Sequence, residues 1–188
     1  MFVIDALRVD FVTEENMPFL HGLIAKNATQ TRFFNFRADP PTTTSQRLKG
    51  ITTGSLPTFI DISSNFESPA IQEDNWVDIF HRERDREREL TRSTSEGKDN
   101  DDHAMRGRMR RMKKKKSIFL GDDTWPLLYP TQFDISKPFD SFNTRDLDTV
   151  DDGIEKYLWP LLTSHAEDGD EDQDEDDEDG WGLFVVHF

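Results

Sequence analysis

The stretch MFVIDALRVDF (residues 1–11), followed by DPPTTTSQRLKGITTGSLPTFID (residues 39–61), decides how this chain folds. The first apolar run ends at Asp5. Such a run is typical of a buried parallel strand that delivers a carboxylate at its carboxyl end, where open α/β sheets bind their ligands. In the second stretch, two prolines favour extended backbone before three threonines, which can cap a helix that continues through QRLK. The sequence therefore predicts a strand-end carboxylate and the hydroxyl-rich start of a helix.

This combination suits a metal-assisted phosphoryl transferase. Asp5 offers a hard oxygen ligand to a divalent cation. A helix N-terminus presents N–H groups and a partial positive charge on which a phosphate can dock. A metal beside a threonine hydroxyl lowers its pKa enough to make an alkoxide nucleophile. The same residues also suit an ordinary loop, cap and turn, and on the residues alone that alternative stays open.

The order of apolar and amphipathic segments predicts the fold class. We expect strands at 2–5, 117–120 and 183–187, and helices at about 16–26, 44–53, 70–80 and 150–162. Strands that alternate with helices are typical of βαβ units. The predicted class is therefore α/β, with a mostly parallel sheet and helices on both faces.

Composition predicts one domain with two charged insertions. The 188 residues are 34% hydrophobic and 32% charged, with a formal net charge of −15. Much of this charge lies at 81–116 and 166–180, which we expect to be disordered surface insertions. The basic stretch RMRRMKKKK (residues 108–116) suits a solvated loop that pairs loosely with the acidic tract better than a nucleic-acid site, so no nucleic-acid partner is expected. The chain has no cysteine, which excludes disulfides, thiolate ligands and cysteine nucleophiles.

Three other groups of polar residues have structural interpretations. Asp122 and Asp123 follow a short strand, where they suit an Asx-capped turn, although a role in lining a site stays open. His187 lies on an apolar strand, and we expect it to be a satisfied core histidine. A cluster of aspartates lacks the spacing of a calcium loop and is expected to open a helix with acidic residues. Its members are Asp146, Asp148, Asp151 and Asp152.

Six blocks of the sequence carry a resemblance to a known family. They are MFVIDALRVDF, DPPTTTSQRLKGITTGSLPTFID, SNFESPAIQEDN (64–75), IFLGDDTWPLLYP (118–130), SFNTRDLDTVDDGIEKYLWPLL (141–162) and GLFVVHF (182–188). In this order they resemble the GPI ethanolamine phosphate transferase 3 family of the alkaline phosphatase superfamily. QRLKG favours this family over its sisters in the same pathway. The resemblance implies a mannose-ethanolamine phosphotransferase of GPI-anchor biosynthesis, which moves phosphoethanolamine from phosphatidylethanolamine to the third mannose of a GPI precursor.

The resemblance also implies site residues. In the superfamily the nucleophile tends to lie ten residues before a glycine that closes the following helix. Gly54 then assigns this role to Thr44, with Thr42 and Thr43 as weaker candidates. Asn65 matches a residue that helps hold the oxyanion. The implied cofactor is a divalent metal, zinc in the family, bound by Asp5 and Thr44.

The family further implies partners and a location. These are a phosphatidylethanolamine donor, a GPI glycolipid acceptor, a small membrane partner subunit and the endoplasmic reticulum membrane, with the catalytic domain in the lumen. In the relatives an Asp and a His that complete a second metal site follow the equivalent of Phe188, and membrane anchors flank the domain. We therefore expect residues 1–188 to be a truncated N-terminal part of an alkaline-phosphatase-like catalytic domain that is inactive alone. The alternative is a catalytically silent fragment or charged binding remnant of such an enzyme.

Overall fold

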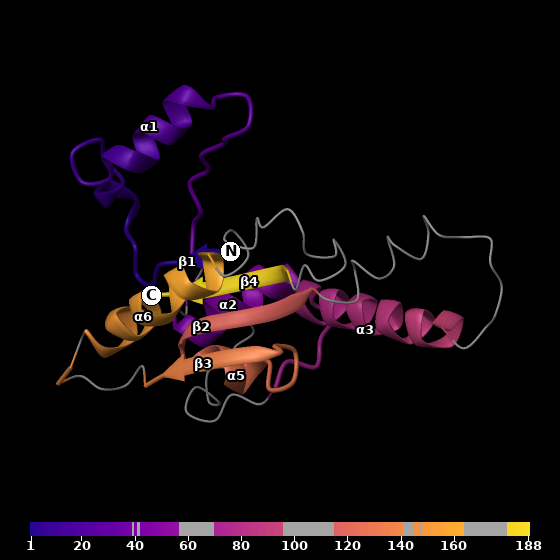
Figure 1. The fold of residues 1–188 in the computed structure, drawn as a ribbon. Coiled ribbons are helices and arrows are strands. Elements are labelled where there is room, and N and C mark those ends of the chain that lie inside the picture. The colour runs from indigo at the N-terminus through magenta and orange to yellow at the C-terminus, as the bar shows by residue number, and fades with distance from the viewer. Residues whose placement is uncertain are drawn as a thin grey trace.

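A parallel sheet forms the centre of the described structure. The computed structural model describes residues 1–38, 40, 42–56, 70–95, 115–140, 145–146, 148–163 and 180–188. Within them, four strands lie in the order β1 (Phe2–Val3), β4 (Trp181–His187), β2 (Lys116–Asp122) and β3 (Ile135–Phe139). Every neighbouring pair is parallel (Figure 1). The predicted α/β class is confirmed, and the arrangement is consistent with an alkaline-phosphatase-like fold.

The two central strands are buried because their apolar side chains face both sides of the sheet. Ile118 pairs with Phe184 and Leu120 with Val186 in the β2–β4 register. Phe119 and Val185 belong to the core on one face of the sheet, whereas those two pairs belong to the core on the other. Nearly continuous apolar runs are what a parallel sheet covered on both faces requires.

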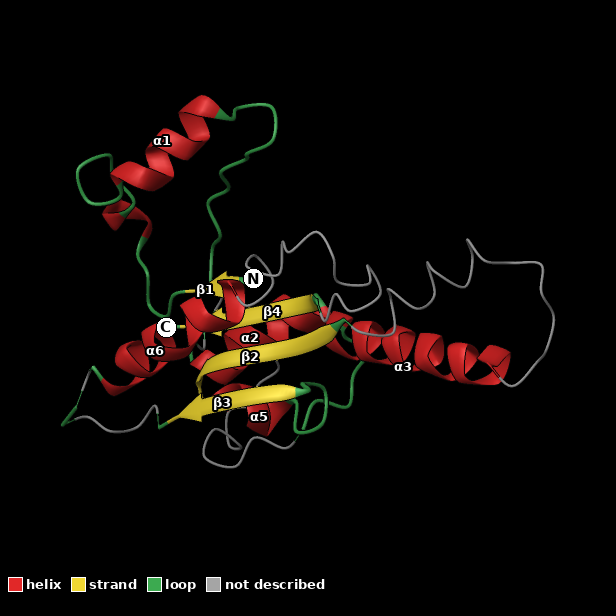
Figure 2. Ribbon diagram, viewed as in Figure 1, coloured by secondary structure: helices red, strands yellow, loops and turns green. Residues whose placement is uncertain are grey.

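Helices cover both faces (Figure 2). On one face lie α2 (Thr44–Thr53), the start of α3 (Trp76–Ser95) and α5 (Thr124–Leu128), which contribute Leu48, Val77 and Trp125 to the core. On the other face lies α6 (Thr149–Thr163), which contributes Ile154 and Leu158. The sequence pattern predicts neither α5 nor β3 (Ile135–Phe139).

One segment stands away from the sheet. It contains the short helix η1 (Val9–Phe11) and α1 (Pro18–Lys26), and it leaves and rejoins the sheet through extended chain (Figure 1). None of the residues of η1 or α1 is buried. Within the described residues, no helix combines the length and apolar character needed to cross a membrane.

The charged tract that begins at His81 differs from the prediction. Residues 81–95 continue α3 as a regular helix, although this part of the predicted 81–116 insertion was expected to be disordered. The cause lies on one face of the helix, where Arg84 is only 5% exposed. Its guanidinium donates to Ser117 Oγ and Asp134 Oδ2, and Ser117 N–H donates to the same Oδ2 (2.8 Å). Residues 96–114, and 166–179 of the second insertion, lie outside the described residues.

This ion-pair network has a clear electrostatic consequence. Burial alone would raise the pKa of Asp134, but hydrogen bonds from Ser117 and the positive charge of Arg84 hold that pKa below its ordinary value. Because the network joins α3 to the starts of β2 and β3, it fixes the charged helix against the sheet. It lies at the end of the sheet opposite the strands' carboxyl ends.

Candidate active site at the carboxyl end of the sheet

Asp5 lies at the predicted edge of the sheet, two residues after the end of β1 (Phe2–Val3), which is shorter than the predicted strand at 2–5. Its N–H donates to Phe188 O (3.0 Å), and Phe188 N–H donates to Val3 O (3.0 Å), so the end of β1 is tied to the end of β4. Ala6 then takes a positive φ of 52°, and the chain turns away from the sheet. Such backbone is uncommon for a residue with a side chain. The Asp5 carboxylate is left exposed at the edge where parallel sheets bind ligands.

Thr44 meets this carboxylate across 39 residues of sequence. Its Oγ1 donates a hydrogen bond to Asp5 Oδ2 at 3.3 Å. Thr44 is the first residue of α2, and Thr43 is the N-cap, with extended backbone and no side-chain capping bond. The structure therefore brings together the two residues that the sequence predicts as nucleophile and ligand, and it places the Thr44 hydroxyl against the Asp5 carboxylate.

The predicted helix after the threonines has the expected bounds. It runs from Thr44 to Thr53 and ends at Gly54, which adopts a left-handed φ of 71° that favours glycine. At the start of α2, Arg47 N–H donates to the carbonyl of the N-cap, Thr43 O (3.0 Å). The N–H groups of the first turn therefore have no partner within the helix, and together with the helix dipole they can accept a phosphate.

The end of β2 approaches β4 very closely. Gly121 has a φ of 138°, and a Cβ built there would lie 2.1 Å from His187 O. Only glycine fits this position. The next residue, Asp122, is 9% exposed, and its Oδ1 accepts a hydrogen bond from Thr124 N–H (2.5 Å). The predicted Asx turn is confirmed, and it leads into α5.

His187 is buried beside these carboxylates. The side chain is 1% exposed, and its Nδ1 has no hydrogen-bond partner among the described residues. Burial lowers the pKa of His187 below its ordinary value, while the negative charges of Asp122 and Asp5 act in the opposite direction. The prediction of a satisfied core histidine is therefore wrong in one respect, because the ring is buried without full satisfaction. No local signal in the sequence indicates this, since it depends on which strand ends meet.

The donor chemistry fits part of a divalent cation site. Asp5 and Thr44 place a carboxylate and a hydroxyl side by side, and both are hard oxygen donors. The described residues contain no group of three or more His, Cys, Asp or Glu that could hold a metal ion. The predicted pair is therefore compatible with a cation but supplies only two donors. Asn65, the predicted oxyanion residue, lies outside the described residues.

The aspartate cluster before α6 has the structural role that the sequence predicts. Asp146 Oδ1 accepts hydrogen bonds from the N–H groups of Asp148 (3.2 Å) and Thr149 (3.1 Å). A hydrogen bond from the Thr149 hydroxyl lowers the pKa of the Asp146 carboxyl. Asp151 lies in the first turn of the helix. These acids start a helix, as expected of carboxylates at a positive helix end.

Comparison with known proteins agrees with the sequence motifs. The chain is similar over its whole length to GPI ethanolamine phosphate transferase 3, catalytic subunit, from Homo sapiens (35% identity over 204 residues). It is 36% identical over 183 residues, 89% of the chain, to GPI ethanolamine phosphate transferase 3 from Saccharomyces cerevisiae. It is 30% identical over 190 residues, 99% of the chain, to GPI ethanolamine phosphate transferase 2, catalytic subunit, from Homo sapiens. The resemblance to this transferase family is confirmed, with higher identity to the type 3 proteins.

The match covers a small part of these relatives. The chain spans 15% of the length of each of these three proteins. No protein-family model matches the chain, and no solved structure matches it significantly.

Proposed function

We propose that this chain forms the phosphoethanolamine-accepting part of a transferase of GPI-anchor biosynthesis. Two observations support the proposal: the names of the relatives that match 89–100% of the chain, and the hydrogen bond from Thr44 Oγ1 to Asp5 Oδ2 (3.3 Å). The pair lies at the carboxyl end of a parallel sheet and at the start of a helix of 10 residues. This is a suitable place for a phosphate and a nucleophile.

In the proposed reaction Thr44 Oγ attacks the phosphorus of phosphatidylethanolamine. A P–O bond forms to Thr44 while the bond to the glycerol oxygen breaks, and diacylglycerol leaves with a proton. A mannose hydroxyl of the GPI precursor, the third mannose in our proposal, then attacks the same phosphorus and loses its proton. Thr44 leaves as the free hydroxyl, so the two displacements restore the enzyme.

The residues around Thr44 have separate roles in this scheme. Asp5 Oδ2 orients the threonine hydroxyl through the observed hydrogen bond. First-turn N–H groups of α2, together with Asn65, would hold the phosphate oxygens as negative charge develops on them. A divalent cation, zinc in our proposal, would be held by Asp5 and Thr44, and when bound it supplies Lewis-acid charge that lowers the pKa of the hydroxyl.

The cellular context is part of the same proposal. A phosphatidylethanolamine donor and a GPI glycolipid acceptor place the reaction at the endoplasmic reticulum membrane, with the catalytic domain in the lumen. We propose that contact with the membrane involves segments of a longer protein, and that a small membrane subunit assembles with it. Relatives named for GPI ethanolamine phosphate transfer support this context.

A segment exchange tests the proposal. The matched segment of the Saccharomyces cerevisiae enzyme is replaced by residues 1–188, and transfer of phosphoethanolamine to a GPI acceptor is measured. The exchanged enzyme should be active, Thr44→Ala should abolish transfer, and Thr43→Ala should keep most of it, since Thr43 makes no side-chain capping bond. Normal transfer by the Thr44→Ala variant would refute the proposal.

The same experiment distinguishes the proposed enzyme from the alternative, a catalytically silent remnant. A remnant that keeps only the fold would leave the exchanged enzyme inactive even with Thr44 in place. For residues 1–188 expressed alone we propose no turnover, because catalytic zinc sites take three protein ligands and Asp5 with Thr44 supplies two. Bound zinc and released phosphoethanolamine, measured on that chain, test this directly.

A further inference from the structure

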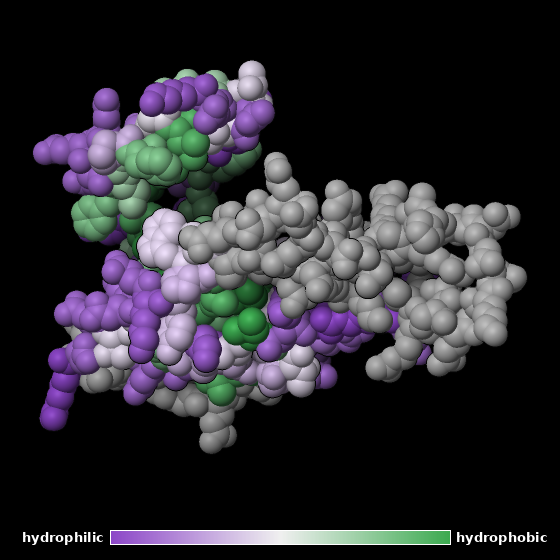
Figure 3. Space-filling model, viewed as in Figure 1, coloured by the Kyte–Doolittle hydropathy of each residue, from purple (hydrophilic) through white to green (hydrophobic). Residues whose placement is uncertain are grey.

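The segment between Asp5 and the threonines exposes an unusual number of aromatic rings. We call residues 6–38 the N-terminal arm; it holds η1, α1 and the extended chain that follows them. Phe34 is 79% exposed, Phe36 is 69% exposed and Phe33 is 53% exposed, and Phe19 on α1 is 83% exposed. Apolar residues gather on the face of the arm that Figure 3 shows. Exposed apolar patches of this kind mark surfaces that bind something.

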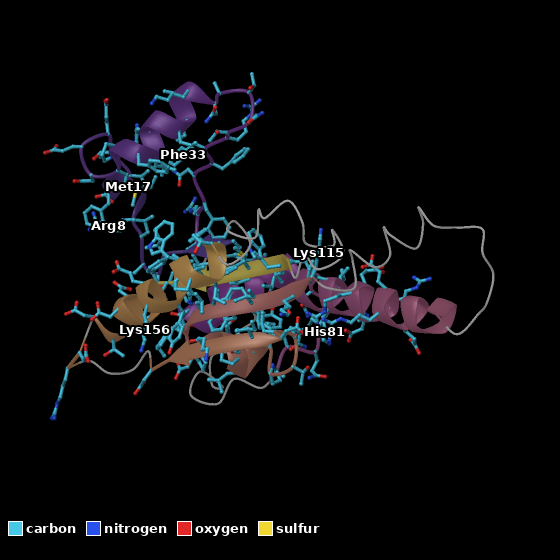
Figure 4. The ribbon with its side chains drawn as sticks, viewed as in Figure 1. Arg8, Met17, Phe33, His81, Lys115 and Lys156 are labelled. Carbon is cyan, nitrogen blue, oxygen red and sulfur yellow. The ribbon has the colours of Figure 1, made fainter. Side chains whose placement is uncertain are left out.

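The first part of the arm, from Arg8 to α1, is held together by contacts of its own. Arg8 ion-pairs with Asp10 (2.6 Å) and lies over the ring of Phe11 (5.0 Å). His21 Nε2 lies 3.2 Å from Val12 O, which ties α1 to the chain after η1. Figure 4 shows Arg8, Met17 and Phe33 on the arm, apart from the sheet. These contacts hold together the part of the arm from Arg8 to α1, and the rings of Phe33, Phe34 and Phe36 lie on the chain that follows α1.

The charge pattern of the arm identifies the chemistry of its partner. Arg32 and Arg37 bracket the three exposed rings in the sequence RFFNFR. The arm contains four basic and three acidic residues, in a chain with a net charge of −15. Its charged residues are Arg8, Lys26, Arg32, Arg37, Asp10, Glu14 and Glu15. Aromatic rings flanked by arginines suit a phospholipid surface, where rings occupy the headgroup region and guanidinium groups bind lipid phosphates.

The arm also lies close to the candidate site along the chain. Phe36 and Thr44 are eight positions apart in the sequence, so even a fully stretched connection between them would span at most about 26 Å. The other end of the arm leaves the sheet directly after Asp5. One end of the arm thus follows Asp5 directly, and the other end, at residue 38, lies six positions before Thr44.

We propose that the N-terminal arm inserts Phe33, Phe34 and Phe36 into the headgroup–acyl boundary of a phospholipid bilayer. The inserted rings hold the Asp5–Thr44 site at the surface where its substrate lies. This inference rests on the proposed function, since it takes the phosphoethanolamine donor to be a membrane lipid. It assigns contact with the bilayer to residues of this chain, and it requires neither metal nor catalysis.

The absence of cysteine makes a site-specific test direct. Phe34→Cys and, as a matched control, Leu127→Cys on α5 (57% exposed) are each labelled with an environment-sensitive fluorophore. Vesicles of phosphatidylcholine and phosphatidylethanolamine should shift the emission of the probe at 34 to the blue and leave the probe at 127 unchanged. Quenching by lipids labelled in the upper acyl chain should affect only the probe at 34.

A second set of variants measures the binding itself. Replacing Phe33, Phe34 and Phe36 with serine should weaken vesicle binding on the order of tenfold or more, because most of the apolar surface available for insertion is removed. A matched triple replacement of Ile79, Leu127 and Trp159, which are exposed on other elements, should keep it. Circular dichroism of both triple variants checks that the fold is retained.

Every result of these vesicle experiments either supports the proposed insertion of the arm or overturns it. Vesicle binding lost only in the arm variant supports the proposal. Equal binding by the arm variant, no binding by the unmodified chain, or a probe at 34 that responds only to self-association would overturn it. The Thr44→Ala chain should bind vesicles normally, so failure of the proposed reaction and failure of lipid binding give different results.

Discussion

Gly121 provides the sharpest test of how the sheet builds the candidate site. A Cβ at this position would lie 2.1 Å from His187 O and 2.9 Å from both His187 C and His187 N. All three atoms are backbone, so no flexible side chain can move aside. Gly121→Ala therefore forces β2 and β4 apart beside Asp122 and His187.

The expected loss of stability follows from two terms. Holding alanine at a φ of 138° adds strain of roughly 1–2 kcal/mol. Separating the strands breaks at least one ladder hydrogen bond, worth about 1 kcal/mol, and loosens the buried contacts around it. We expect a total of about 3–4 kcal/mol, a large share of the roughly 5–15 kcal/mol that stabilises a typical domain.

Two other glycines serve as matched controls. Gly54 also has a positive φ, of 71°, but a Cβ there meets no atom of the described residues within 4 Å. Gly54→Ala should therefore lower stability by about 1 kcal/mol. Gly22 lies inside α1 in open space, and Gly22→Ala should raise helix stability by about 0.5–1 kcal/mol.

Urea unfolding followed by circular dichroism measures all three variants. The urea midpoint should be highest for Gly22→Ala and lower for the unmodified chain. It should be lower still for Gly54→Ala and lowest for Gly121→Ala, with a similar dependence of the unfolding free energy on urea concentration in all four. A loss below about 1 kcal/mol for Gly121→Ala would refute the close approach of β2 and β4.

Arg84→Met should lower the free energy of unfolding by about 2–4 kcal/mol, because it leaves the partly buried Asp134 without its main charge partner. Arg88→Met, a matched change at a more exposed arginine, should lower it by less than about 1 kcal/mol. Equal effects in urea unfolding would contradict the network around Asp134. Burial raises the pKa of Tyr129 to about 12, so the neutral phenol is favoured in the folded state. The contribution of Tyr129 to the free energy of unfolding is present below about pH 10 and is lost as the pH rises toward 12. Unfolding experiments at a series of pH values should show this fall in stability, and Tyr129→Phe should remove it.

The parts of the fold that local patterns specify were predictable. The bounds of α2 follow from the prolines before it and from Gly54 after it, and both act within a few residues of sequence. The short apolar run before Asp122 predicts the buried strand β2 directly. The pairing of Asp5 with Thr44 was predictable from the family resemblance, because Thr44 begins α2 and does not lie at the end of a described strand.

Features that depend on tertiary contacts were not predictable. Strand β3 contains Lys137 and Pro138, which hide its pattern, and proline is tolerated there because β3 is an edge strand. The tract after His81 looks like a solvated charged loop by composition. Helical periodicity would place Val77, Arg84 and Arg88 on one face of a helix. The carboxylate that neutralises Arg84 belongs to Asp134, however, which lies outside this helix, so the local sequence does not reveal it.

The candidate site likewise contains features that local sequence predicts and features that depend on tertiary contacts. The Asx turn at Asp122 follows from turn chemistry, whereas the unpartnered Nδ1 of His187 results from the junction of three strand ends. No residue near His187 in sequence signals that its ring lacks a hydrogen bond. Buried polar groups of this kind are visible only once the packing around them is known.

The central claim is that Thr44 carries phosphoethanolamine covalently. The most direct measurement incubates the segment-exchanged enzyme with phosphatidylethanolamine in the absence of a GPI acceptor, stops the reaction, and locates any modified residue by peptide mass spectrometry. We predict one phosphoethanolamine adduct on the peptide that contains Thr44, attached to that residue, and no adduct in the Thr44→Ala variant. An adduct on another residue, or an unmodified Thr44 in an enzyme that transfers normally, would contradict the account.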